Sequence, residues 1–413
     1  MNKKDINAIK VAKKFVGQKW KIEDIAKDMK MTISQVNRYL KYAREKSIIE
    51  TKINENIKLD KTYTRIERLE ATLCTEFKLT SAIVVEMDYN KLGQPDKDGF
   101  TFNDTHSKID DEMHEILGMA LADDLIKRFR PDDKNIAVGG GRGPFYTIKG
   151  LQKKQAVIPK GKKIQVTSLS GAMSTRLWGQ PTDTSDLQFT DLDPDNIAIY
   201  LSNLFRSTPK RTFLPIAVET NDIKNQLLNQ GSGQLLSIKN WENEKKQYVP
   251  SIAIVGIGSL AGGHRIARPY EGLELEPIKK DLNKLLGYTK EVISETKHKY
   301  YPVGDICNRL FLAETSPRLK SDVSIKDNLG KIKGLIDSLN KRIIAVEEKQ
   351  LRMIPFVVAI AGGIVKFNAI WTTLMKPLKE KKEPLIHILC TDSKTAKNLI
   401  EEYEAFQTQS EPI

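Results

Sequence analysis

The first fifty residues carry apolar side chains at the spacing of three short helices. Residues 6–16 place apolar side chains every three or four positions, which predicts a first helix that ends near Gly17. A second apolar stripe covers residues 22–29, and the carboxylates in its first turn suit the positive end of a helix dipole. Residues 30–32 then predict a turn into a third helix.

The third predicted helix combines an apolar face with a strongly polar one. Thr32 or Ser34 can cap its first turn, and we expect four side chains to face inward: Ile33, Val36, Leu40 and Ala43. The polar face fits the DNA major groove, where Gln, Asn and Arg make paired hydrogen bonds to bases and Ser, Thr and Lys hold phosphates. The candidate DNA-binding residues are Thr32, Ser34, Gln35, Asn37, Arg38, Lys41 and Arg44. The alternative, a three-helix bundle with a solvated charged face, explains the periodicity but not this polar set.

After residue 78 the pattern changes to short β-branched runs that alternate with helical stretches. This alternation is typical of strands joined by crossover helices over a parallel sheet, and it predicts an α/β fold. The candidate strands cover residues 81–86, 135–138, 163–168, 213–217, 251–255, 356–361 and 385–390.

Glycines follow three of the candidate strands. They stand at positions 139–141 and 143, at 256 and 258, and at 362 and 363. In an open α/β sheet, ligands bind beyond the carboxyl ends of the strands, and glycine there lets backbone amides approach an anion. The three loops together predict a pocket for a phosphorylated or polyhydroxylated small molecule. Each loop alone is more often a tight turn, and the spacings of the dinucleotide and nucleoside-triphosphate motifs are absent.

Several polar stretches lie between these elements. Residues 47–58 are compatible with a short strand or wing, and residues 61–77 predict a connecting helix that carries either a dimer contact or an intradomain packing face. Residues 88–104 and 179–195 are rich in turn-forming residues and read as linkers or insertions. Residues 316–342 predict one surface helix.

The distribution of charge supports a nucleic-acid partner for the N-terminal part. The chain has a net charge of +13, and its first 70 residues hold 18 Lys and Arg against 10 Asp and Glu, a net charge of +8. A basic module joined to a nearly balanced body is typical of contact with nucleic acid or another anionic surface. A well-solvated, lysine-rich helix surface is the alternative.

Composition bounds the class of protein. With 413 residues, 40% hydrophobic and 29% charged, the chain is long enough for two or more globular domains. Cys74, Cys307 and Cys390 are far apart and form no CxxC pair, so neither a disulfide framework nor a cysteine zinc site is expected. The longest apolar run, residues 354–365, is too short to span a bilayer. We therefore expect a cytoplasmic protein without a membrane partner, metal or cofactor.

In order along the chain, these segments resemble the SorC-type sugar-binding transcriptional regulators, which are related to the DeoR-type repressors. The resemblance runs nearly end to end. It starts with VNRYLKYAREKSII in the helix-turn-helix and LEATLCTEFKLTSAIVV at the entry to the effector domain. NIAVGGGRGP and SIAIVGIGSL are similar to the two glycine loops of the family, and YPVGDICNRLF to its Gly-Asp-Ile-Cys signature. VVAIAGGIVKFNAIWTTL and HILCTDSKTAKNLI resemble its closing strand, loop and helix.

The resemblance implies a domain organisation and a function. Residues 1–58 would form the helix-turn-helix DNA-binding domain, residues 59–78 a linker helix, and residues 79–413 the domain for effector binding and oligomerisation. That last domain would be a Rossmann-like, doubly wound fold similar to sugar-phosphate isomerases and deaminases, used for sensing rather than turnover. Regulators of this type bind double-stranded operator DNA as homodimers or homotetramers, and a phosphorylated sugar or related metabolite changes that binding.

The resemblance also implies a set of ligand-binding residues. The first loop would border the phosphate and the second would line the opposite edge, while Asp305 would accept hydrogen bonds from sugar hydroxyls and Lys366 would donate them. The alternatives are a helix N-cap for Asp305 and a solvated helix residue for Lys366. The expected ligand-binding set is Gly139, Gly140, Gly141, Arg142, Gly143, Gly256, Gly258, Asp305 and Lys366.

Two departures from the family pattern leave alternatives open. Family members place a Thr or Ser soon after the first glycines, whereas here Arg142 stands there and Thr147 comes late. Arg142 would either replace the hydroxyl by a bidentate contact or mark a degenerate site in a constitutive DNA-binding protein. An isomerase or deaminase is the remaining alternative, with Asp305 as base and His106, His114 and His264 as the histidines least obviously buried, but no catalytic set emerges.

Overall fold

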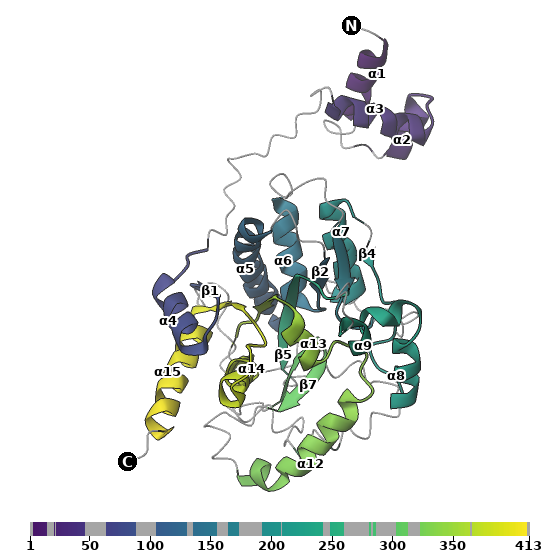
Figure 1. Cartoon of the computed structure of the whole chain (residues 1–413). Helices are drawn as coiled ribbons and strands as arrows, with labels where there is room; N and C mark the ends of the chain where they lie inside the picture. Colours follow the sequence, from purple (N-terminus) through teal and green to yellow (C-terminus); the bar gives the residue numbers. More distant parts are fainter. Residues whose placement is uncertain are drawn as a thin grey trace. The chain divides into compact units, whose positions relative to one another are not determined.

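The chain divides into two compact units, Met1–Thr62 and Tyr63–Ile413 (Figure 1). The computed structural model describes residues 3–14, 20, 22–45, 63–87, 105–129, 135–154, 164–172, 192–207, 209–242, 248–259, 281, 284–285, 303–312, 323–363 and 366–410.

Three helices are described in the N-terminal unit: α1 (Lys3–Ala12), α2 (Ile22–Asp28) and α3 (Ile33–Glu45). They assemble because each has apolar side chains on one face, and these faces share a small core. The core side chains are Val11, Ile25, Ala26, Val36 and Leu40, with Ala8, Ala12 and Ala43 in a second cluster. Two hydrogen bonds join α1 to α3. The Tyr42 hydroxyl donates to Asp5 at 2.9 Å, and the Asn7 amide donates to the Tyr39 hydroxyl at 3.2 Å.

The turn between α2 and α3 begins with a left-handed residue. Lys30 has a φ of +52°, and the amide of Met31 donates to the carbonyl of Ala26 at 2.9 Å. This six-to-one bond is that of a Schellman motif, which ends α2 and turns the chain into α3. The predicted helix-turn-helix is thereby confirmed. The first helix ends at Ala12, and Gly17, where it was expected to end, lies outside the described residues.

A parallel sheet forms the centre of the second unit. Among the described residues its strand order is β1-β9-β8-β5-β2-β3-β4. Strands β6 and β7 form an antiparallel hairpin, and β6 pairs with the carboxyl-terminal end of β5. The strands are β1 (Ser81–Val85), β2 (Asn135–Val138), β3 (Gln165–Ser168), β4 (Pro209–Lys210), β5 (Ile252–Ser259), β6 (Val303–Ile306), β7 (Arg309–Leu312), β8 (Phe356–Ile360) and β9 (Ile388–Asp392). The predicted α/β fold with a parallel sheet is confirmed.

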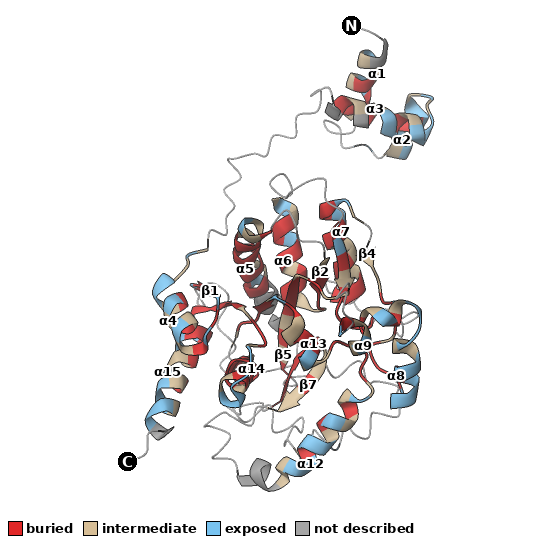
Figure 2. Ribbon diagram, viewed as in Figure 1, coloured by how far each residue is buried: buried red, intermediate tan, exposed pale blue. Residues whose placement is uncertain are grey.

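Helices cover both faces of this sheet, because alternate strand residues point to opposite sides. Ile83, Ile136 and Ile254 pack on one side, whereas Val84 and Ala137 pack on the other. The first side is covered by α5 (Thr105–Arg128), α6 (Arg142–Lys153) and α7 (Pro194–Phe205). The second is covered by α4 (Glu67–Phe77), α12 (Val323–Asn340), α14 (Phe367–Glu380) and α15 (Ser393–Ser410). Figure 2 shows the strands buried between helices whose outer faces are exposed.

Short elements complete the second layer. They are α8 (Asn221–Leu228), the 3-10 helix η5 (Gly231–Leu235), α9 (Ile238–Trp241) and α13 (Glu348–Met353). Trp241 is fully buried in the same core as the side chains of α12 and α14, so α9 belongs to this layer.

One predicted strand is wrong. Residues 213–217 form only isolated bridges, from Pro215 to Ala172 and from Ala217 to Ile343. Phe213 has a φ of +52°, outside the strand region, and Pro215 lacks an amide donor for a ladder. Leu214, Ile216 and Ala217 are buried on irregular backbone, and the strand that pairs with β3 is the two-residue β4 just before this run.

The predicted helical connections have mixed outcomes. Residues 316–342 contain the expected surface helix as α12, and residues 61–77 contain α4, whose Leu73 and Phe77 are buried in the core of the second unit. The predicted wing at residues 47–58 and linker at residues 88–104 lie outside the described residues, as does most of the second predicted linker, residues 179–191. No helix among the described residues has the length and apolar content that crossing a bilayer requires.

Candidate functional site

The chain changes its direction of travel across the sheet between β2 and β5. From β2 it continues to β3 and β4, whereas from β5 it continues to β8 and β9 on the other side. All of these strands are parallel, so their carboxyl ends lie along one edge. We call the carboxyl ends of β2 and β5 the switch-point edge. Open α/β sheets bind their ligands at such a point.

The first glycine loop leaves β2 at this edge. Gly141 has a φ of +105°, a conformation that favours glycine, and stands at the N-cap of α6. A Cβ at Gly143 would lie 2.6 Å from the side chain of Ile360, so glycine also lets α6 approach β8. The amides of Gly139 and Gly141 donate to the carbonyls of Ile254 and Leu192, both at 2.8 Å. These two amides therefore fix the loop, and the first turn of α6 supplies its positive dipole end.

The second predicted glycine loop is not a loop: Gly256 and Gly258 lie inside β5, which continues to Ser259, so this prediction is wrong. This part of β5 lies beside the first glycine loop. A Cβ at Gly256 would be 3.4 Å from Pro144 and 3.7 Å from the carbonyl oxygen of Gly140. Gly258 pairs with Asp305 across β5 and β6, and a Cβ there would lie 1.8 Å from Asp305 Oδ1. Glycine at 258 is thus required for the carboxyl group to occupy its position.

Asp305 is a buried carboxyl group at the switch-point edge. Its Oδ2 accepts the amide of Asn308 at 2.9 Å, and its Oδ1 is buried without a hydrogen-bond partner in the structure. Burial raises the pKa of Asp305 to about 7, against the smaller lowering effects of the Asn308 amide and the charge of Lys366. Asp305 lies in β6, so the alternative of a helix N-cap is wrong.

Lys366 approaches the same carboxyl group from another element. It is the N-cap residue of α14, and its Nζ lies 2.9 Å from Nε2 of His114, which comes from α5. His114 is 2% exposed, so the expectation that it is accessible is wrong. This distance places the two nitrogen atoms within hydrogen-bond range of each other. His106 and His264 have no described side chains.

A buried carboxylate also organises the loop after β8. Asp392 Oδ2 accepts the amide of Gly363 at 2.8 Å and the hydroxyl of Thr395 at 2.6 Å, and its Oδ1 accepts the amide of Thr395 at 2.9 Å. A Cβ at Gly362 would lie 2.7 Å from the same Oδ2. The carboxylate therefore fixes the backbone that leads to Lys366.

A second buried carboxylate fixes the neighbouring loops after β3 and β4. Asp195, in the first turn of α7, accepts hydrogen bonds from the Ser168 hydroxyl at 2.5 Å and from the amides of Thr212 and Phe213 at 3.1 Å each. The Phe213 ring is 64% exposed, and the guanidinium of Arg211 lies 4.3 Å from its centre. Leu192, three residues before Asp195, accepts the Gly141 amide, so this network touches the first glycine loop.

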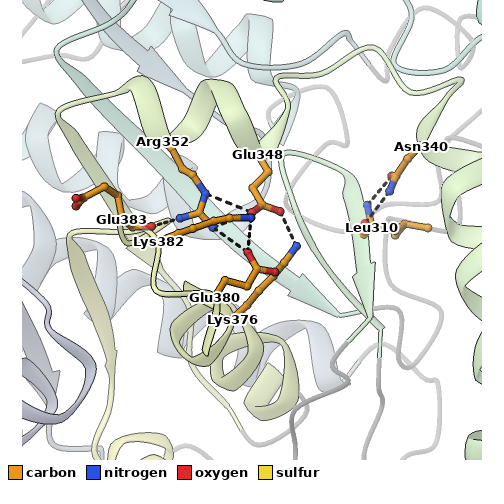
Figure 3. Close-up of polar contacts among 8 residues, drawn as sticks. All are labelled: Leu310, Asn340, Glu348, Arg352, Lys376, Glu380, Lys382 and Glu383. Atoms are coloured by element: carbon orange, nitrogen blue, oxygen red, sulfur yellow. Dashed lines mark hydrogen bonds and ion pairs between the residues drawn. The ribbon is translucent and has the colours of Figure 1, made fainter. Parts of the chain in front are cut away.

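A separate cavity of about 490 Å³ is lined in part by the β6–β7 hairpin. None of the expected ligand-binding residues lines it. Its walls come from β7, α12, α13 and α14, and Figure 3 shows the polar contacts there. Asn340 pairs with the backbone of Leu310 through both its amide nitrogen and its oxygen, while Glu348 accepts from Lys376 at 2.6 Å and from Arg352 at 2.7 Å.

The expected DNA-binding residues occupy two kinds of position in the N-terminal unit. Thr32 and Gln35 form a reciprocal capping box: Oγ1 of Thr32 accepts the Gln35 amide at 3.1 Å, and Oε1 of Gln35 accepts the Thr32 amide at 2.8 Å. Ser34, Asn37 and Arg38 are exposed on α3. The side chains of Lys41 and Arg44 lie outside the described residues.

The expected inward position of Ile33 is wrong. Val36, Leu40 and Ala43 are buried as predicted, but the side chain of Ile33 is 49% exposed. It occupies the first position of α3, beyond the point where α1 and α2 cover that helix, and it is absent from the two clusters that form the core of this unit.

Several solved structures are similar to this chain, one of them over nearly its whole length. Full-length sorbitol operon regulator SorC from Klebsiella pneumoniae superimposes with a TM-score of 0.51 at 17% identity, covering 97% of this chain and 100% of that chain. A probable sor operon regulator from Shigella flexneri gives 0.52 at 18% identity, over 81% of this chain and 98% of its own. A transcriptional regulator from Streptococcus pneumoniae gives 0.52 at 17% identity, over 81% and 97%. No family model and no curated protein matches the sequence.

The chain has the SorC regulator fold. At these identities the similarity shows the fold alone. The binding properties of this chain have to be argued from its own residues. In this chain the expected ligand-binding residues all lie at the carboxyl edge of the parallel sheet. They come from the segments after β2 and β8, from the end of β5 and from β6.

Sequence reasoning did not identify several residues that shape this edge. Asp195 and Asp392 are buried, and a single buried Asp carries no periodic signal. His114 was named only for the isomerase or deaminase alternative, and its contact with Lys366 was not foreseen. For the two carboxylates the one available signal was position, because Asp392 comes two residues after an apolar run and Asp195 directly follows a proline at a helix start.

Proposed function

We propose that this chain is a DNA-binding transcriptional regulator whose operator binding is modulated by a small phosphorylated sugar. The observation that carries the proposal is the combination, in one chain, of two features. One is a helix-turn-helix with an exposed polar face on α3, and the other is a SorC-fold body in which the first glycine loop meets the glycines of β5 at a topological switch point. The proposal assigns the chain to the cytoplasm, as expected from the sequence.

The DNA-binding role rests on α3. Asn37 and Arg38 are exposed, and their side chains make paired hydrogen bonds to adenine and to guanine respectively in a major groove. Ser34 is in the first turn, next to the positive end of the helix dipole, where a phosphate binds. Thr32 and Gln35 act by fixing this end of the helix through their capping box. Lys41 and Arg44 add cationic contacts in this proposal.

The ligand-binding role rests on the switch-point edge. The phosphate would bind at the first turn of α6, with the Arg142 guanidinium and the loop from Gly139 to Gly143 around it. Gly258 leaves room for the Asp305 carboxyl group, and Gly256 lets Pro144 and the first glycine loop approach β5. Asp305 Oδ1, buried without a partner, would exchange a hydrogen bond with a sugar hydroxyl, since leaving a buried polar atom unpaired costs free energy. Lys366 would donate to the same ligand.

The proposed regulatory mechanism is a shift of population. The ligand binds one arrangement of the subunits in a homodimer or homotetramer more tightly, and that arrangement changes the spacing of the two recognition helices. Two half-sites would lie about one helical turn of DNA apart, or a multiple of it. The proposal keeps the domain division expected from the sequence. Residues 1–58 would bind DNA, residues 59–78 would form the linker helix, and residues 79–413 would bind the ligand and form the oligomer.

Binding to DNA upstream of the chain's own gene tests the proposal. The full chain should bind such fragments more tightly than random DNA at two salt concentrations, because base contacts persist when phosphate contacts are screened. Arg38→Ala should remove the preference, whereas Lys239→Ala, an exchange of a lysine in the second unit, should keep it. Equal affinity for random DNA at both salt concentrations would refute the proposal. Sequence preference without any change in melting temperature from sugar phosphates would instead indicate a constitutive DNA-binding protein.

A further inference from the structure

An apolar side chain is displayed among the polar ones at the start of α3. Ile33 is 49% exposed, and its neighbours Thr32, Ser34 and Asn37 are exposed as well. Single exposed apolar residues are common on protein surfaces. This one, however, stands at the first position of the helix that carries the candidate base-reading residues.

The backbone around Ile33 is held firmly. The capping box between Thr32 and Gln35 encloses Ile33 and Ser34 and satisfies an amide at each end. On the preceding side, the left-handed Lys30 and the bond from Met31 to Ala26 fix the turn. A β-branched side chain on such a backbone has few rotamers, so displaying it toward a ligand costs little conformational entropy.

The geometry of the helix places Ile33 beside Asn37. Residues four apart on a helix lie one turn apart on the same face, so Ile33 and Asn37 present one apolar and one amide group side by side. In the major groove an adenine offers a paired site to an amide, and a thymine offers a 5-methyl group to an apolar side chain. Because base pairs stack along the groove, one helix turn contacts neighbouring base pairs.

We infer that Ile33 is a specificity-determining residue that packs against the 5-methyl group of a thymine in the operator. The inference rests on the proposed DNA binding and adds the chemical group that is read. It predicts a thymine within a step of the base pair that Asn37 contacts. It also explains why the apolar residue is exposed in the free protein: the partner that covers it is the DNA.

Replacing thymine by uracil in the DNA tests the contact, since this removes only the methyl group. The full-length chain first selects its preferred site from random duplexes, and each thymine of that site is then replaced by deoxyuridine in turn. At one thymine per half-site, the replacement should weaken binding by roughly three- to fivefold, the effect of removing one buried methyl group. Ile33→Ala should weaken binding to the unmodified site by a similar factor and should be insensitive to that replacement.

Two further variants make the result specific. Ile33→Val keeps a branched apolar side chain and should keep most of the sensitivity to uracil. Ile6→Ala removes an isoleucine of comparable exposure, 39%, from α1 and should bind and discriminate as the wild type does. Melting temperatures of all three should match the wild type, because the replaced side chains are partly or largely exposed.

The outcomes separate the inference from the proposed function. A site that is selected, but at which every uracil replacement affects Ile33→Ala and the wild type equally, would overturn the role of Ile33 and leave DNA binding intact. Failure of the wild type to select any sequence would refute the proposed function, and the inference with it.

Discussion

Buried carboxyl groups fix the geometry of the candidate ligand site residue by residue, but they do so in two different ways. Asp195 and Asp392 each accept several hydrogen bonds, which satisfy their buried oxygen atoms. Asp305 has only the Asn308 amide on one oxygen and none on the other. Asp195 and Asp392 therefore hold the loops in place, whereas Asp305 has an oxygen atom that can still form a hydrogen bond with a ligand.

Asp195→Ala should lower the free energy of unfolding by about 3 kcal/mol, because it leaves the amides of Thr212 and Phe213 buried without an acceptor. Chemical denaturation of the full chain measures this. Asp222→Ala, at an exposed position in α8, is the matched control and should change stability by no more than about 0.5 kcal/mol. Similar small effects for both variants would show that Asp195 does not hold the loop.

Asp305 should make stability fall as the pH rises. Its pKa is 3.8 in the ordinary state and about 7 in the fold, so between these values the folded chain binds a proton that the unfolded chain has lost. The stabilisation is present below pH 4 and is lost as the pH rises through about 7. The free energy of unfolding, measured from pH 4 to 8, should decline less steeply in Asp305→Asn than in the wild type. Parallel pH profiles for the two proteins would contradict the assignment.

At the scale of elements, the sheet edge was more predictable than the connections around it. Strands β2 and β8 were predicted within one residue because they are short apolar runs ended by glycine. The hairpin β6–β7 was missed because its two strands, around Asp305 and Arg309, contain charged residues and lack alternation. The candidate site was predictable where glycine marks it. Its polar supports were not, since they depend on long-range contacts such as Lys366 with His114.

The contacts that Glu348 and Arg352 make with Lys376 and Glu380 connect α13 to α14 (Figure 3) and predict an acid-sensitive contribution to stability. Burial alone would raise the pKa of Glu348, but the hydrogen bonds from Lys376 and Arg352 outweigh it and lower the pKa. The stabilisation is therefore present above the ordinary pKa of 4.5 and is lost as the pH falls through the lower value of the fold.

Glu348→Gln should accordingly cost about 1 kcal/mol at pH 7, a modest amount because solvent screens a half-buried group. The difference from the wild type should shrink below pH 4. Denaturation at both pH values measures it, with the exposed Glu401→Gln on α15 as the control. A cost that is unchanged by acid would show that charge pairing is not its origin.

At the scale of the whole molecule, one chain combines a positively charged three-helix unit with an α/β unit of the SorC fold. Its sequence is only 17% identical to that of the solved SorC structure. The order of units was predictable from charge and periodicity, because a +8 segment with helical spacing precedes the alternation of strands and helices. The identity of the proposed ligand was not, because it depends on side chains that meet only in the folded chain. In the proposed mechanism, coupling between DNA binding and ligand binding is reciprocal, so the effect of either ligand can be measured through the binding of the other.

The affinity of the full-length chain for its selected DNA site, titrated with a panel of pentose and hexose phosphates, tests the central claim most directly. At least one compound should change the dissociation constant about tenfold, within the usual range of allosteric coupling. Lys366→Ala should bind the same DNA without compound as tightly as the wild type and should lose the response. Equal affinity for the selected and a scrambled site, or a response that Lys366→Ala retains in full, would contradict the account.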